Sequence, residues 1–147
     1  MAQTPIENGP KKGDVVINEY DERHNEEDID VSAYDHSSAT NKPDYLVGWL
    51  TKSGGALALA ADAANVTGII TTADKIVRNA AETAITNENA DKFRQIVRGP
   101  AIVKKSGINV TDTAGATITI ATVITALKAL GITVVDDPAE TETQTAH

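Results

Sequence analysis

The residues of this chain that could perform chemistry are its three histidines and the polar side chains next to one of them. His24 and His36 lie in an acidic N-terminal stretch, and His147 is the last residue. Asp35, His36 and Ser37 are the residue types of a hydrolytic triad, in which a base activates a hydroxyl nucleophile. Sequence neighbours do not generally reach one another in triad geometry. An ordinary polar loop is therefore favoured, and a small hydrolase remains the less favoured alternative.

Metal and phosphate motifs are incomplete. Asp28, Asp30 and Ser32 have the spacing that opens a calcium-binding loop, but Ala33 and Ala39 replace the glycine and the final carboxylate that such a loop needs. The histidines lack the tight spacing of zinc motifs. No glycine pair is followed by the Lys-Ser/Thr step of a phosphate loop. We therefore expect no catalytic site, no metal ion and no cofactor.

Charge divides the 147 residues into three parts. The net charge is −7 over residues 1–45, +3 over residues 46–135 and −4 over residues 136–147. Segments that repel themselves and contain few large apolar residues cannot offset their ordering entropy. We therefore expect an acidic N-terminal arm (1–43), a compact domain (44–135) and an acidic C-terminal tail (136–147).

The overall composition narrows the possible partners. An isoelectric point near 4.7 lacks the positive excess that binds phosphate backbones, so we expect no nucleic-acid partner. The longest apolar stretch, residues 118–135, is interrupted by Lys128 and Gly131, which argues against a membrane partner. No cysteine is present, so stability must come from packing or from oligomerisation.

The central part predicts a mixed α/β (α+β) fold: a small β-barrel-like or sheet-rich domain with one or two short helices, preceded by the extended N-terminal arm. Residues 56–64 are ambiguous between helix and strand. The predicted strands are 45–50, 66–71, 93–98, 101–103, 117–120 and 132–135, and the predicted helices are a short one within 74–90 and one at 123–130. Gly131 stands where a left-handed residue ends a helix.

The Gly99-Pro100 step interrupts an apolar run. Proline removes an amide donor and glycine permits unusual backbone shapes, so the pair is expected to bend or end the strand before it. Trp49 is the only tryptophan and is expected in the core or at a subunit contact. Arg94 and Arg98 are expected either on a solvated strand face or in salt bridges with the acidic arm of a neighbouring subunit.

The acidic arm carries apolar residues that a purely solubilising tail would not need. We expect them to anchor the arm when it orders on a partner, where a β-branched segment can add a strand to an exposed sheet edge. These expected partner-binding residues are Val15, Val16, Ile17, Tyr20, Ile29, Val31 and Tyr34.

Three signals follow one another in the centre of the chain: a strand at 66–70, two strand-like pieces joined by Gly-Pro at 92–103, and a helix end, glycine stop and short strand at 125–135. Their order resembles the small head decoration proteins of tailed bacteriophages, over roughly residues 44–135. The arm is longer and more acidic than in the simplest members of that family.

The resemblance implies a structural protein and not an enzyme. It would be made in the host cytoplasm and would bind the outer surface of an expanded capsid as a homotrimer. Its partner would be the major capsid protein, which it would stabilise against the pressure of packaged DNA. A virion or cell-surface adhesion module is the alternative that the same residues leave open.

Overall fold

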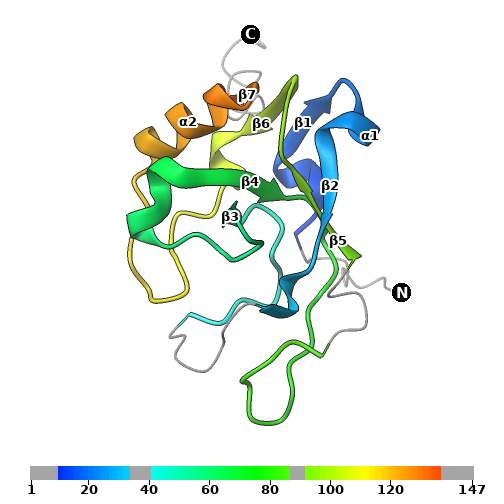
Figure 1. Cartoon of the computed structure of the whole chain (residues 1–147), viewed down its shortest axis with the longest axis vertical. Helices are drawn as coiled ribbons and strands as arrows, with labels where there is room; N and C mark the ends of the chain where they lie inside the picture. The colour runs from blue at the N-terminus through cyan, green and yellow to red at the C-terminus, as the bar shows by residue number, and fades with distance from the viewer. Residues whose placement is uncertain (1–9, 34–40, 87–91, 137–147) are drawn as a thin grey trace, which may run out of the picture.

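Two small sheets form the framework of the protein, which we describe from a computed structural model covering residues 10–33, 41–86 and 92–136. The first sheet has the order β1-β6-β7, with β1 (Val16–Glu19) antiparallel and β7 (Ile132–Val135) parallel to the central β6 (Ala101–Lys104). Figure 1 shows β1 and β7 on opposite sides of β6, so strands from the two ends of the chain flank one central strand.

The second sheet is antiparallel throughout and has the order β2-β5-β4-β3. Its strands are β2 (Glu26–Ile29), β3 (Leu50–Lys52), β4 (Val66–Ile70) and β5 (Phe93–Ile96). β5 and β6 follow each other along the chain but belong to different sheets. The segment between them carries the chain from one sheet to the other.

The helix α2 (Ile120–Ala129) lies between β6 and β7 in the chain and packs against β4, β7 and the 3-10 helix η4 (Ala60–Asn65). Its Val123 and Leu127 are one turn apart and fully buried. The other helical segments of the described residues are α1 (Glu22–Asn25), η2 (Lys12–Asp14), η3 (Val31–Ala33) and η6 (Lys105–Gly107).

Buried apolar residues form two clusters on the two faces of the second sheet. Because side chains alternate along a strand, the neighbours Ile69 and Ile70 point to different clusters, and so do Phe93 and Ile96. The first cluster includes the buried face of α2. The second includes Trp49 and also two residues of the N-terminal segment, Ile29 and Val31.

The turn between β5 and β6 contains a close contact of two backbones. The Gly99-Pro100 peptide is cis, and the Gly99 amide donates to the Leu130 carbonyl at 2.8 Å. A Cβ atom on Gly99 would lie 1.7 Å from the Gly131 carbonyl oxygen. Gly131 itself has a φ of +88° directly after α2, as predicted for a helix stop. Both glycines are thus required where the two turns touch.

The predicted mixed α+β, sheet-rich class is confirmed, although the sheets of the described residues form no closed barrel. The expected strands near 66–71, 93–98, 101–103 and 132–135 and the helix before Gly131 are present. The helix expected within 74–90 is absent from residues 74–86, which form turns and an isolated bridge between Arg78 and Ile85. Residues 117–120 form a single bridge and the start of α2 instead of a strand.

The expected N-terminal arm needs a correction for the described residues 10–33. Residues 16–19 pair with β6, and residues 26–29 pair with β5, so this segment contributes one strand to each sheet. Residues 1–9 and 34–40 of the expected arm, and residues 137–147 of the expected tail, lie outside the described residues. The net acidic charge predicted a free arm. In the structure, Arg94 and Arg98, which are distant in sequence, form ion pairs with acidic residues of this segment.

Candidate functional site

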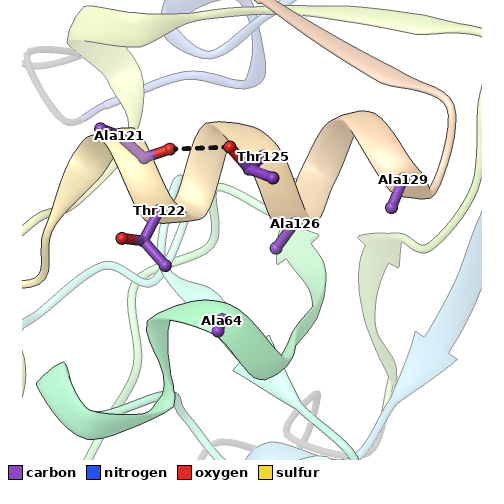
Figure 2. A pocket seen from close by; sticks show the side chains of 6 residues that line it. All are labelled: Ala64, Ala121, Thr122, Thr125, Ala126 and Ala129. Atoms are coloured by element: carbon purple, nitrogen blue, oxygen red, sulfur yellow. Dashed lines mark hydrogen bonds between the residues drawn. The ribbon is translucent and has the colours of Figure 1, made fainter.

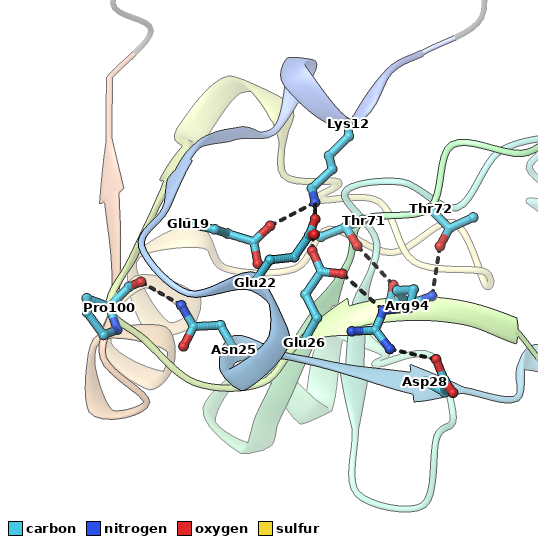
Figure 3. Close-up of polar contacts among 10 residues, drawn as sticks. All are labelled: Lys12, Glu19, Glu22, Asn25, Glu26, Asp28, Thr71, Thr72, Arg94 and Pro100. Atoms are coloured by element: carbon cyan, nitrogen blue, oxygen red, sulfur yellow. Dashed lines mark hydrogen bonds and ion pairs between the residues drawn. The ribbon is translucent and has the colours of Figure 1, made fainter.

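A cluster of charged side chains joins the N-terminal segment to the sheets. We call Lys12, Glu19, Glu22 and Glu26 the Lys12 cluster. The Lys12 ammonium lies 2.9 Å from Glu19 Oε1, 2.5 Å from Glu22 Oε2 and 2.8 Å from Glu26 Oε2. Figure 3 shows the three carboxylates converging on this one ammonium from β1, α1 and β2.

Burial differs sharply within the Lys12 cluster. The side chains of Glu19 and Glu26 are 6% and 3% exposed, whereas that of Glu22 is 62% exposed. Burial, with a hydrogen bond to Glu26, raises the pKa of Glu19 to about 7. Burial acts to raise the pKa of Glu26 as well, but hydrogen bonds from Glu19, Lys12 and Arg94 hold it below its ordinary value. The negative charge of the pair therefore lies mainly on Glu26, and Glu19 keeps its proton to a higher pH.

Oxygens of the three carboxylates lie within 4.8 Å of one another, a spacing that would suit a cation. The Lys12 ammonium already supplies the positive charge at this point, and its contacts with the three glutamates raise the pKa of Lys12 against the effect of partial burial. We therefore assign no metal ion to the cluster.

Arg94 extends the cluster along the second sheet. Its guanidinium contacts Glu26 Oε1 at 3.2 Å and Asp28 Oδ1 at 2.7 Å. The strand register explains both contacts, since Asp28 is paired directly with Arg94 and Glu26 is the diagonal neighbour on the same face. The hydrogen bond to Asp28, together with that to Glu26, raises the pKa of Arg94.

Arg98 also binds the N-terminal segment. Its Nη2 atom lies 2.5 Å from Glu27 Oε2, and its guanidinium donates a hydrogen bond to the His24 carbonyl. The salt bridges expected between the two arginines and a neighbour's acidic arm are therefore made inside one chain. They hold the segment that the sequence predicted to be free.

The structure separates the expected partner-binding residues into two groups. Val15, Ile29 and Val31 are at most 4% exposed and belong to the core, and Val16 is partly buried against it. Ile17 and Tyr20 are 39% and 62% exposed, on and just after the edge strand β1. Tyr34 lies outside the described residues.

Trp49 is 6% exposed and packs in the second apolar cluster. Of the two environments expected for it, the core is the one that the structure shows. A buried indole offers little surface to another subunit, so the structure of the single chain supports the core alternative.

A shallow hollow of about 530 Å³ runs along the outer face of α2. Figure 2 shows the small side chains that line it: Ala64, Ala121, Thr122, Thr125, Ala126 and Ala129. The Thr125 hydroxyl donates to the Ala121 carbonyl at 3.2 Å within the helix. The hollow contains no charged group.

A second hollow, of about 350 Å³, lies between the Gly54-Gly55 turn and β5. Two of its lining residues are cationic, but Lys52 contacts Asp62 at 2.9 Å and Arg98 contacts Glu27. The positive charges are thus already compensated.

The described residues among those first considered for chemistry do not line these hollows, and Asp35, His36, Ser37 and His147 lie outside the described residues. Of the histidines, only His24 falls in the described residues; it lies on the exposed short helix α1. Asp28 pairs with Arg94, and Asp30 Oδ1 accepts a hydrogen bond from the Ser32 amide at 2.9 Å. Asp28 thus forms an ion pair, and Asp30 stabilises a turn.

Sequence reasoning missed three polar residues that organise the fold. Lys12 is one. Asn25 is fully buried and donates from Nδ2 to the Pro100 carbonyl at 2.7 Å, which ties α1 to the turn between the sheets. Asp112 is 2% exposed and accepts hydrogen bonds from three backbone amides, those of Ala60, Ala114 and Ala116. Their partners are remote in sequence or are backbone groups, so no motif marks them.

The chain matches no protein-family profile, no curated protein and no solved structure. In the described residues, no helix has the length and apolar character needed to cross a bilayer.

Proposed function

We propose that this protein is a head decoration protein of a tailed bacteriophage, a structural virion component that binds the outer surface of the expanded capsid as a homotrimer. The proposal starts from the order of the strand, Gly-Pro and helix-glycine-strand signals in the sequence. Each of these signals corresponds to an element of the fold, namely β4, the turn between β5 and β6, and the end of α2 followed by β7.

The observation that carries the proposal is the exposure of Ile17 and Tyr20 at the β1 edge. In the part of the chain that the structure describes, β1 is an outer strand of its sheet. An outer strand offers unpaired backbone groups to a partner strand, and exposed apolar side chains add contact area and register. An extended segment of the major capsid protein is the partner that we propose for this edge.

The attachment of β1 supports a mechanical role. Val15, directly before the strand, is buried in the core, and Glu19 at its end joins the Lys12 cluster. A pull on β1 is therefore transmitted to both sheets. Three such edges in a trimer would multiply weak contacts through avidity, which is how a small protein would hold a shell against internal pressure.

The test is the heat stability of expanded capsids assembled from the major capsid protein of a tailed bacteriophage. Added protein should raise the temperature at which the shells open. The double variant Ile17→Ser/Tyr20→Ser should bind far more weakly and give little protection. Val77→Ser is the matched control, because Val77 is 55% exposed but lies outside the sheets, and it should protect like the unaltered protein.

Three results would each contradict the proposal or a part of it. Shells that open at the same temperature with and without the protein would exclude a cementing role. A double variant that protects as well as the unaltered protein would exclude the β1 edge as the contact. Sedimentation of the free protein and of decorated particles should show trimers, and single copies without mutual contact on the particle would contradict the oligomeric part.

A further inference from the structure

Glu19 and Glu26 bring a pair of buried carboxyl groups to the junction of the two sheets. Glu19 ends β1 in the first sheet, and Glu26 begins β2 in the second. Their side chains are 6% and 3% exposed. Two ionised carboxylates that are close together and shielded from water repel each other strongly. In such pairs one carboxyl group ordinarily keeps a proton, which the two groups share and which reduces the repulsion.

The neighbouring groups do not supply enough positive charge. The charged groups nearest the pair are Lys12 from η2 and Arg94 from β5, which contact it, and Glu22 from α1 and Asp28 from β2, which contact these two cations. These include two cations, against four carboxylates when the pair itself is counted. In the described part of the chain, Glu19 Oε2 is buried and has no hydrogen-bond donor. A proton between the two carboxyl groups satisfies this oxygen and reduces the excess negative charge.

We propose that the Glu19–Glu26 pair is a pH-sensitive latch, in which one shared proton holds residues 12–29 against both sheets and loss of that proton as the pH rises to neutrality loosens this segment. The latch stands on the buried pair alone and does not require the proposed capsid function. The segment that it controls includes the exposed Ile17 and Tyr20.

The direction of the pH effect follows from the protonation of Glu19. Its pKa is raised by burial and by the hydrogen bond to Glu26, from the ordinary 4.5 to about 7 in the folded protein. The folded state therefore keeps a proton that the loosened state releases between these two values. The stabilisation is fully present below about pH 4.5 and is lost as the pH rises through about 7.

The first test follows the Glu19 carboxyl carbon of the unaltered protein by NMR during a pH titration. A midpoint near 7 is expected for Glu19. A midpoint below about 5.5, which lies within ordinary scatter for a glutamate, would overturn the latch. This measurement needs no mutation, so it decides the proposal even if a variant fails to fold.

The second test measures amide hydrogen exchange in β1 and β2 from about pH 5 to about pH 8.5, with rates corrected for base catalysis. Protection should fall by up to tenfold per pH unit between about pH 5 and the midpoint near 7, or about 100-fold in total, and should level off above the midpoint, where both states have lost the proton. Glu19→Gln, which mimics the protonated carboxyl, should abolish this dependence. Glu27→Gln removes the same charge from a side chain that is 51% exposed, and it should preserve the dependence. Equal pH profiles for the unaltered protein and Glu19→Gln would overturn the proposal.

Discussion

β1 and β7 occupy equivalent places on either side of β6, yet they are held there by different forces. β7 follows α2, and the residues that seat this unit, Val123, Leu127 and Ile132, are all fully buried. β1 has the buried Val15 at its start and the charged Lys12 cluster at its end. Apolar packing holds β7 in place, whereas packing and ion pairs together hold β1 in place.

The acidic segment 10–33 belongs to the folded core because apolar burial and compensated charges act together. Residues 10–33 gain apolar burial through Val15, Ile29 and Val31, each worth about 1.5 to 3 kcal/mol before ordering costs. Their negative charge is compensated by Lys12 within the segment and by Arg94 and Arg98 from the second sheet and the turn after it. Net charge alone therefore did not reveal whether the segment folds.

The largest expected effect is at the glycine contact that seats the α2–β7 unit. In Gly99→Ala, the new Cβ atom would meet the Gly131 carbonyl oxygen at 1.7 Å, and both turns must move. We expect a loss of about 4 kcal/mol in the free energy of unfolding, measured by urea denaturation. Gly13→Ala is the control in the N-terminal segment; nothing lies within 4 Å of its added Cβ atom, so the change should stay within about 0.5 kcal/mol. Similar midpoints for the two variants would refute the close contact.

The next effect tests whether the N-terminal segment is part of the cooperative core. Ile29→Ala removes a side chain that is 4% exposed and packs in the second apolar cluster, so we expect a loss of about 2 to 4 kcal/mol in a single unfolding transition. Ile17→Ala makes the same change where the side chain is 39% exposed and should cost much less. An unchanged midpoint for Ile29→Ala would restore the interpretation of a free arm.

The smallest expected loss in the free energy of unfolding concerns the ion pairs of Arg94 and Arg98. Arg94→Ala removes one partner of the buried Glu26, but Lys12 remains, so we expect a loss of about 1.5 kcal/mol. In Arg98→Ala the lost pair is exposed on both sides, at 40% and 51%, and the loss should be below about 1 kcal/mol. Thermal melts at low and high salt would measure both. An Arg98 effect larger than that of Arg94 would contradict the importance of burial.

The parts of the fold that could be predicted were those with a local signal. Apolar spacing over 123–130 followed by Gly131 predicted the end of α2 and the strand after it, because helix contacts and caps involve neighbours in sequence. The strand predicted at 45–50 appears only at Leu50–Lys52, since the residues before it form turns and a single bridge. The contact that joins Arg94 to Glu26 of the Lys12 cluster left no signal, because these residues are 68 positions apart.

By itself, the sequence determined the mixed α+β class, the helix stop at Gly131 and the interruption at Gly99-Pro100, since each depends on backbone preferences of nearby residues. Only the tertiary structure decided that Val15, Ile29 and Val31 are core residues while Ile17 and Tyr20 face outward. The physical reason is strand pairing: a short strand has no stable conformation alone, and which of its sides is buried is set by partner strands far away in the sequence.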